Sequence, residues 1–525
     1  MRTVREVVYA FFRAQGMTTM FGNPGSTELP FLADFPEDFT YVLGLHEAAA
    51  VGMADAYAQV TGRPAVVNLH TAPGVGNAVG ALVNARSNRA PLVVTAGQQV
   101  RAMMQLEALL TNTDAVDLPK PTVKWSYEPP RPQDVPAALA RATYLAMQPP
   151  RGPVFVSLPM DDLDAPADDA ATDLVVDRKV FGRAAPDPWA LGGLVERLGS
   201  AENPVLVLGG AVDASNGIGA AVALAEKLRV PVWRAPEPGR IGFPEDHPYF
   251  RGSLPNAIAP LSDKLAGHDL IVVVGAAVFK YYPYMPGDFL PDGATLFQVT
   301  DDADEAARAP MGDAIIADPA LTLERLAELV PPADRPEPTG RPAPRTPAYG
   351  DGPLAADAVF ATVAETLPDD AVIFNESPSN LAAFRDQIRP GRPSSFFFTT
   401  SGGLGFALPG AVGAALARPD HPVLAIVGDG SAQYAITALW TAARYNAPVT
   451  FLVLVNSEYK ILKWFGDREG VSGAPGLDLG GIDHVSLARG YGVPSVRAET
   501  ADAVREALKE AFAAPGPRLV EVPIG

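Results

Sequence analysis

Short runs rich in β-branched residues and leucine recur along the 525-residue chain, separated by alanine-rich segments with helical periodicity. The clearest runs lie at 64–69, 90–97, 204–210, 269–275, 371–375, 422–430 and 448–456. Runs of this length without polar alternation are typical of parallel strands buried on both faces. The pattern predicts an α/β protein of doubly wound parallel sheets, in which ligands bind beyond the carboxyl ends of the strands.

Two segments of different composition divide these runs into three blocks. Residues 161–187 are acidic and poor in large apolar side chains, and residues 331–353 carry eight prolines. Proline-rich and polar stretches of this kind form surface linkers and extended spacers. We therefore predict three doubly wound domains, at 1–180, 181–340 and 341–525.

The charge balance and the lack of cysteine exclude several functions. With 41 Lys and Arg against 60 Asp and Glu, the net charge is −19, which disfavours nucleic acid as a partner. The absence of cysteine rules out disulfides, thiolate metal sites and a cysteine nucleophile, and agrees with a cytoplasmic location. Arg5 and Arg13 interrupt the apolar N-terminus, and the uncharged stretches 64–85 and 394–417 are rich in glycine. We expect no targeting segment and no membrane partner.

A Gly-Asp-Gly turn in the third block is the strongest chemical motif. Asp429 follows one predicted strand and Asn456 follows the next, 456 − 429 = 27 residues later, which suits one strand–helix–strand unit. The two oxygen-bearing side chains are thus expected at the same sheet edge, where they would suit Mg²⁺ or Ca²⁺ carrying a phosphate group. The amides of Gly430 and Ser431 open a helix whose N-terminus favours an anion. Without Asn456, an ordinary Asp-Gly turn that binds no ligand would be the simpler interpretation. The Asn at this spacing favours the metal site instead.

The Gly-Asp-Gly and Asn pair resembles the cofactor motif of the thiamine diphosphate enzymes. The resemblance implies that Asp429, Asn456 and the backbone carbonyl of Glu458 bind the metal, although this chain has Val455 where many members have a first Asn. It also implies that Glu47, at the start of a helix, shares a proton with the aminopyrimidine ring. A first-turn Glu that helps the helix dipole is the alternative. The further cofactor-binding residues that the resemblance implies are Asn77, Asn375, Ser379, Gly402, Leu404, Gly430, Ser431 and Tyr459.

Further segments are similar to the benzoylformate decarboxylases, a family of thiamine diphosphate-dependent 2-oxo-acid decarboxylases. They lie at 21–30, 68–70, 97–99, 107–112, 375–377, 402–409 and 438–443. The similarity implies that Ser26 holds the substrate carboxylate and that His70 orients the keto oxygen and transfers protons, as an imidazole can near neutral pH. Taken alone, Ser26 could be a helix cap and His70 a core histidine. The implied substrate pocket is Leu110, Tyr282, Pro378, Phe398, Ile461 and Phe465.

Three of these pocket residues depart from the family pattern. Tyr282 stands where the family has a second histidine, and a phenol exchanges protons poorly at neutral pH. Ile461 replaces an alanine and Pro378 a threonine, which predicts a narrower pocket beside the cofactor.

Together, the metal motif and the resemblance imply a lyase that converts an aromatic or related 2-oxo acid into an aldehyde and CO₂, using thiamine diphosphate and Mg²⁺ or Ca²⁺. Two alternatives are a carboligase that forms 2-hydroxyketones from aldehydes, and a decarboxylase for smaller or branched 2-oxo acids. A degenerate binding protein is disfavoured because Glu47, Asp429 and Asn456 are all present. The family forms its site between two chains, so we expect a dimer at minimum and a homotetramer as the assembly. Gly209, Gly210, Gly217 and Gly219 do not match a dinucleotide-binding loop, and we expect no FAD.

Overall fold

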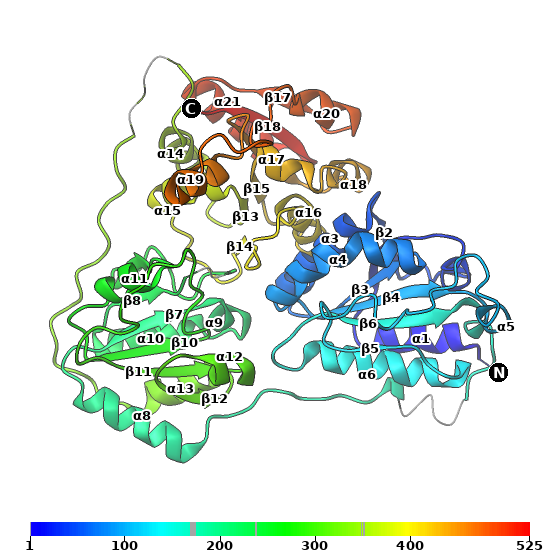
Figure 1. Ribbon diagram of the computed structural model, residues 1–525, viewed down its shortest axis with the longest axis horizontal. Helices are drawn as coiled ribbons and strands as arrows, with labels where there is room; N and C mark the ends of the chain where they lie inside the picture. The colour runs from blue at the N-terminus through cyan, green and yellow to red at the C-terminus, as the bar shows by residue number, and fades with distance from the viewer. Residues whose placement is uncertain (1, 169–174, 237–238, 348, 350–351) are drawn as a thin grey trace. The chain divides into compact units, whose positions relative to one another are not determined.

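The computed structural model describes residues 2–168, 175–236, 239–347, 349 and 352–525 (Figure 1). Residues 169–174 of the expected first linker, and 348 and 350–351 of the second, lie outside this description. The chain divides into two compact units. The first comprises Met1–Phe181, Pro347–Phe384 and Thr399–Gly525, and the second comprises Gly182–Thr346 and Arg385–Phe398.

Parallel strands form three sheets, which confirms the predicted α/β class. The strands of the N-terminal sheet are β1 (Thr19–Asn23), β2 (Thr40–Leu43), β3 (Ala65–Leu69), β4 (Leu92–Gln98), β5 (Ser126–Tyr127) and β6 (Val154–Pro159). The second sheet contains β7 (Val205–Leu208), β8 (Val232–Arg234), β9 (Phe250–Ser253), β10 (Leu270–Val274), β11 (Thr295–Thr300) and β12 (Asp313–Ile316). The C-terminal strands are β13 (Val372–Glu376), β14 (Phe396–Phe398), β15 (Val423–Gly428), β16 (Val449–Val455), β17 (Ser495–Arg497) and β18 (Arg518–Pro523).

Helices connect the strands throughout. In the N-terminal part they are α1 (Val4–Ala14), α2 (Leu29–Leu32), α3 (Glu47–Thr61), α4 (Thr71–Ser87), α5 (Arg101–Met104), η1 (Pro132–Asp134), α6 (Val135–Met147) and η2 (Met160–Asp162). In the middle part they are α8 (Pro188–Ser200), α9 (Gly210–Ala214), α10 (Ile218–Leu228), α11 (Ile258–Lys264), α12 (Ala303–Arg308) and α13 (Pro319–Leu329). The C-terminal helices are α14 (Ala356–Thr366), η3 (Pro378–Asn380), α15 (Leu381–Gln387), α16 (Ala407–Ala417), α17 (Asp429–Gln433), α18 (Ala438–Arg444), α19 (Lys460–Glu469), α20 (His484–Gly490) and α21 (Ala501–Ala513).

The strand order explains where ligands can bind. The N-terminal sheet runs β2-β1-β3-β4-β6-β5, so the chain reverses direction of winding between β1 and β3. A crevice opens beyond the carboxyl ends of the strands at such a reversal. Helices α3 and α4 cover one face of this sheet and α1 and α6 the other (Figure 1). In the C-terminal sheet, the first unit contributes the order β13-β15-β16-β18-β17, and each neighbouring pair in this order is parallel.

Helix α3 is buried on nearly every side and packs closely against α16. A Cβ added at Gly413 would lie 2.0 Å from the carbonyl oxygen of Met53, and one at Gly52 would lie 2.7 Å from Cγ of Pro409. Glycine is therefore required where these two helices cross. The N-terminal part of the first unit contributes α3 and the C-terminal part contributes α16, so this contact joins the two parts.

Side chains of α18 and the residue after it also fix the edge strand β2. The Tyr445 hydroxyl accepts a hydrogen bond from the amide of Leu43 and donates one to the carbonyl of Tyr41, both at 2.9 Å. Thr441 Oγ1 donates to the carbonyl of Leu43, also at 2.9 Å. The chain that leads from β2 into α3 is thereby held in place.

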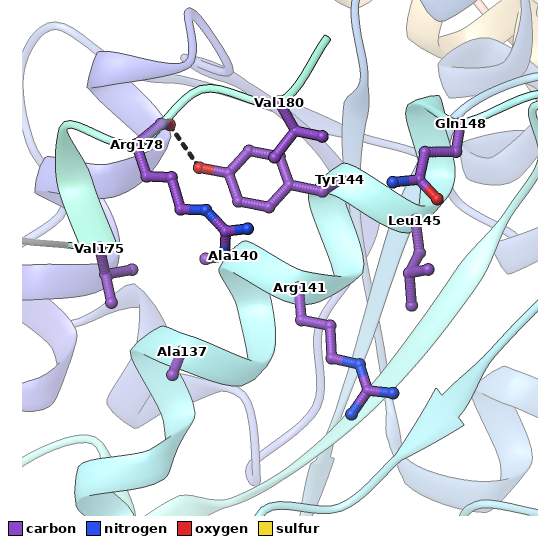
Figure 2. Close-up of a pocket in the computed structure, with 9 residues that line it drawn as sticks. All are labelled: Ala137, Ala140, Arg141, Tyr144, Leu145, Gln148, Val175, Arg178 and Val180. Carbon is purple, nitrogen blue, oxygen red and sulfur yellow. Dashed lines mark hydrogen bonds between the residues drawn. The ribbon is translucent and has the colours of Figure 1, made fainter. Parts of the chain in front are cut away.

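A surface cavity of about 560 Å³ lies along the outer side of α6 (Figure 2). Its lining combines aliphatic side chains with Arg141, Arg178 and Tyr144, whose hydroxyl donates to the carbonyl of Arg178. None of the site residues predicted from the sequence lines this cavity. Elsewhere, every helix among the described residues is too short or too polar to cross a bilayer.

Candidate active site

The carboxyl ends of β1 and β3 bring Ser26 and His70 to the winding reversal of the N-terminal sheet. Asn23, at the end of β1, is in register with Leu69, and His70 follows directly as the residue that caps α4. Ser26 lies exposed in the turn between β1 and α2. The two predicted substrate-binding residues therefore follow neighbouring parallel strands.

Glu28 is a buried carboxylate that holds His70, and the sequence did not point to it. It is only 1 % exposed, and its Oε2 lies 2.8 Å from Nδ1 of His70. The same carboxylate accepts hydrogen bonds from the amides of Gly25 and Gly97, both at 2.8 Å. Thr27 Oγ1 donates to Glu28 at 2.8 Å and lies 3.2 Å from the His70 ring nitrogen. The imidazole is thus fixed through Nδ1, which leaves Nε2 as the nitrogen for a substrate.

We expect Glu28→Gln to lower kcat on the order of 10²-fold, because a misplaced imidazole loses the benefit of a positioned proton-transfer group. A glutamine amide at this position cannot offer two oxygens to the two backbone amides and the ring together. KM should change much less than kcat, since Glu28 is buried behind His70. Steady-state kinetics of aldehyde release measures both constants.

The matched control is Glu6→Gln, which changes an exposed glutamate in the first turn of α1. It should leave kcat unchanged, and Glu28→Asp should recover part of the loss. Wild-type kcat in the Glu28→Gln variant would remove Glu28 from the mechanism.

Glu47 begins α3 and its carboxylate is bound by two side-chain amides. Asn23 Nδ2 lies 3.3 Å from Oε1, and Asn77 Nδ2 lies 3.0 Å from Oε2. The side chain is nearly buried, at 7 % exposure, and Gly74 approaches it closely enough that an added Cβ would lie 3.3 Å from Oε1. Both partners are neutral side-chain amides. Asn23 lies within a motif that the sequence singled out, yet only the structure shows its contact with Glu47.

The turn after β15 and the turn after β16 meet at the C-terminal sheet. Asp429 Oδ1 accepts from the amide of Gly430 at 2.8 Å, and Oδ2 accepts from the amide of Ser457 at 2.6 Å. Asn456 Oδ1 accepts from the amide of Glu458 at 3.1 Å. Burial raises the pKa of the Asp429 carboxyl, and a bound cation would favour its charged form.

The oxygen atoms at this turn suit a hard cation that takes only a few of its ligands from the protein. Among the described residues, no three His, Asp or Glu side chains cluster in a way that could hold a metal ion. A metal at this turn would therefore depend on one carboxylate and neutral oxygen ligands, with further oxygens from a phosphate group. Mg²⁺ binds in this manner, through one or two carboxylates and substrate phosphates. The Glu458 side chain is engaged elsewhere, with Lys463 Nζ at 2.5 Å.

The surroundings of this turn also fit a diphosphate-bearing cofactor. Asn375, the fully buried penultimate residue of β13, accepts hydrogen bonds from the Ser377 amide and hydroxyl through Oδ1, while its Nδ2 has no hydrogen-bond partner among the described residues. An unsatisfied buried donor is costly, and a polar ligand would satisfy it. A Cβ at Gly430 would lie 2.5 Å from the Tyr459 ring, so only glycine allows the close approach of these two segments.

The remaining predicted residues fall in both units. Pro378 and Ser379 form part of η3, which packs against α19, the helix that carries Ile461 and Phe465. Gln98, fully buried, accepts from the amide of Asn112 at 2.9 Å and donates to its carbonyl at 2.8 Å. This anchor holds the loop on which Leu110 adopts a positive φ of 72°.

Tyr282 and Phe398 belong to the second unit. Tyr282 is 60 % exposed, whereas Phe398 is buried and its amide donates to the carbonyl of Gly239. Gly402 and Leu404 lie in the turn before α16.

Comparison with known families defines the class of this site. Models of the thiamine pyrophosphate enzymes match all three parts of the chain: the N-terminal TPP binding domain at 2–118, the central domain at 191–326 and the C-terminal TPP binding domain at 380–522. Thiamine pyrophosphate is another name for thiamine diphosphate. The protein is thus a thiamine diphosphate-dependent enzyme.

Full-length relatives narrow the assignment. A benzoylformate decarboxylase of Pseudomonas aeruginosa is 54% identical over 523 residues, covering 100% of this chain and 99% of that protein. The solved structure of a 4-hydroxybenzoylformate decarboxylase from Rhodococcus jostii RHA1 has a TM-score of 0.98 at 50% identity, covering 100% of this chain and 99% of that chain. A benzoylformate decarboxylase from Polynucleobacter necessarius has a TM-score of 0.97 at 42% identity, with the same coverage of both chains. The chain belongs to the benzoylformate decarboxylase family, whose members are thiamine diphosphate-dependent 2-oxo-acid decarboxylases.

Proposed function

We propose that the protein decarboxylates benzoylformate or a closely related aromatic 2-oxo acid to the aldehyde and CO₂. The observation that carries this proposal is the fixed imidazole of His70, bound by Glu28 and placed with Ser26 at the winding reversal of the N-terminal sheet. A 2-oxo acid needs a group for its carboxylate and a group for its keto oxygen, and these two side chains supply both.

Residues of this chain would hold the cofactor and its metal. Asp429, Asn456 and the Glu458 carbonyl are proposed to bind Mg²⁺ or Ca²⁺. Glu47 would bind the aminopyrimidine ring, and the residues that would complete the cofactor site are Asn77, Asn375, Ser379, Gly402, Leu404, Gly430, Ser431 and Tyr459. When bound, thiamine diphosphate supplies the electron sink that makes loss of CO₂ possible.

The side chains then orient the substrate and move protons. The Ser26 hydroxyl donates a hydrogen bond to the substrate carboxylate without adding a cation that would hold its charge and oppose CO₂ loss. His70 donates from Nε2 to the keto oxygen and serves as the proton-transfer group, because Nδ1 is engaged by Glu28. Glu47 exchanges a proton at its carboxyl with the bound ring.

The assembly and the domain limits are part of this proposal. We propose that the N-terminal part of one chain and the C-terminal part of another form each site, so that the enzyme is a dimer at minimum and a tetramer in its full assembly. We also propose domain limits of 1–180, 181–340 and 341–525, and a cytoplasmic location. Sedimentation of the purified protein across a concentration series tests the assembly.

The substrate is tested by aldehyde release from aryl, branched and short 2-oxo acids. We expect Ile461→Ala to raise kcat/KM for benzoylformate about 10-fold relative to wild type, because the smaller side chain relieves overpacking worth about 1–3 kcal/mol. Leu462→Ala is the matched control, since Leu462 is the exposed neighbour on α19. If kcat/KM for benzoylformate is no higher in Ile461→Ala than in wild type, the narrow-pocket interpretation is wrong. If the wild-type enzyme releases no aldehyde from any of the 2-oxo acids, the proposed function is refuted.

Carboligation is the second candidate function, and Tyr282 favours it. A phenol exchanges protons less readily than an imidazole at neutral pH, so Tyr282 would slow the proton transfer that releases the aldehyde and would favour reaction with a second aldehyde. We expect Tyr282→His to raise the rate of aldehyde release a fewfold and to lower the share of 2-hydroxyketone, measured by chromatography of the products. Tyr284→His, at a more exposed tyrosine two residues away, is the control. An unchanged product ratio would remove Tyr282 from the mechanism.

A further inference from the structure

The segment 399–407, which leads into α16, is fixed at its start by side chains. Ser401 Oγ donates a hydrogen bond to Oδ1 of the buried Asn84 on α4, and it accepts one from the amide of Gly403 at 2.9 Å. Thr399 Oγ1 also reaches Asn84 Oδ1, at 3.4 Å. The segment therefore starts from a point attached to the N-terminal sheet's helix layer.

Its end is fixed by Glu376, the last residue of β13. Glu376 Oε1 accepts from the amide of Gly405 at 2.6 Å, and Oε2 accepts from the amides of Phe406 and Ala407 at 2.7 and 2.6 Å. The side chain is 2 % exposed. Burial raises the pKa of Glu376 to about 7, while the three amide hydrogen bonds act in the opposite direction. A carboxylate buried on backbone amides alone serves to fix that backbone.

Between the two anchors lie Gly402, Gly403 and Leu404. Gly402 has a φ of +77°, and a Cβ added there would meet no heavy atom within 4 Å. Gly405 has a φ of +100°. Backbone with these glycines has wide conformational freedom unless its ends are held. Leu404 is half-buried and takes its position from the two anchors.

We propose that Glu376 is a positioning residue for the cofactor: it fixes the turn 402–405 so that Leu404 and Gly402 meet thiamine diphosphate in a single geometry. The inference rests on the proposed function, which assigns Gly402 and Leu404 to the cofactor site. Glu376 itself acts through the turn and not by touching the cofactor.

The substitution that isolates this role is Glu376→Gln. The new amide keeps one acceptor oxygen but directs an NH₂ group at one or two backbone N–H groups, so donors face donors. Left unpaired in a buried site, those amides disfavour the present turn. The turn then samples several conformations, and binding must select one of them at the cost of affinity.

Two measurements on the full-length protein test the proposal. Titration calorimetry with thiamine diphosphate in excess Mg²⁺ should show at least 10-fold weaker binding for Glu376→Gln than for wild type. Hydrogen–deuterium exchange should accelerate in peptides covering 402–407 and stay unchanged near 501–513 on α21. The control is Glu245→Gln, which changes a buried glutamate of the second unit paired with Arg234 and should leave the cofactor affinity within twofold.

The outcomes separate the inference from the function on which it rests. If wild type itself binds no thiamine diphosphate, the proposed function fails. If wild type binds and Glu376→Gln binds within twofold of it, the positioning role alone is overturned. If the Gln variant does not fold, Glu376→Asp is tested instead, because its shorter carboxylate cannot reach all three amides. A threefold or larger loss of thiamine diphosphate affinity then supports the positioning role, and an unchanged affinity overturns it.

Discussion

Replacement of Glu47 by Gln is expected to lower kcat about 10³-fold, within the range that a positioned proton-transfer group contributes. The amide has nearly the size of the carboxyl and can still accept from Asn23, so the fold and most of the cofactor affinity should survive. What is lost is the ability to exchange a proton with the bound ring. Steady-state aldehyde release and cofactor calorimetry on the same preparation separate the two effects.

The control for this substitution is Glu37→Gln, at an exposed glutamate of the same N-terminal part. It should match wild type in kcat and in cofactor affinity. If Glu47→Gln instead keeps kcat and loses only cofactor affinity, Glu47 holds the ring without exchanging a proton. Retention of both would exclude Glu47 from the site.

Asp429→Asn is expected to weaken Mg²⁺ binding by at least about 10²-fold and to abolish activity at millimolar Mg²⁺. Outer-sphere partners of metal ligands already account for about 10–100-fold in affinity, and Asp429 is proposed as the one charged side-chain ligand. Activity should return in part at high Mg²⁺. Wild type treated with a chelator should lose activity and regain it when Mg²⁺ or Ca²⁺ is restored.

Asp420→Asn serves as the matched control, because Asp420 is an exposed aspartate just before β15. Its metal affinity should equal that of wild type. Full activity of Asp429→Asn without added metal would contradict the assignment, and so would wild-type activity that survives exhaustive chelation.

Chain direction explains why the meeting of Asp429 and the Asn456 turn could be predicted. Parallel neighbours in a sheet place their carboxyl ends together, and a strand–helix–strand unit has a characteristic length. The spacing of 456 − 429 = 27 residues therefore predicted that the two turns meet, as they do where Asp429 Oδ2 accepts from the amide of Ser457. Glu47 was selected through the resemblance to the thiamine diphosphate enzymes, as a residue at the start of a helix, and it is the first residue of α3.

Glu28 and Glu376 could not be found in this way. Each lies within a motif quoted for other residues, and each is buried where backbone amides converge on its carboxylate, at least one of them from a segment far away in the sequence. For Glu28 these amides come from Gly25 and Gly97, and for Glu376 they come from residues 405–407. A glutamate in such a motif looks like any surface glutamate until the tertiary structure supplies its partners. Acidic residues within otherwise apolar motifs are the one signal that could have pointed to them.

The crossing of α3 and α16 bears on how new variants of this enzyme can be built by recombination. Gly52 and Gly413 leave no room for a side chain where the two helices meet, and a helix that is buried on nearly every side is not stable when its partner is missing. A chimaera that takes residues 47–61 from one parent and 407–417 from another packs an α3 against an α16 from a different protein, whose contact surfaces are not complementary. Crossover points for domain exchange should therefore keep these two segments together, even though more than 340 residues of sequence separate them (407 − 61 = 346).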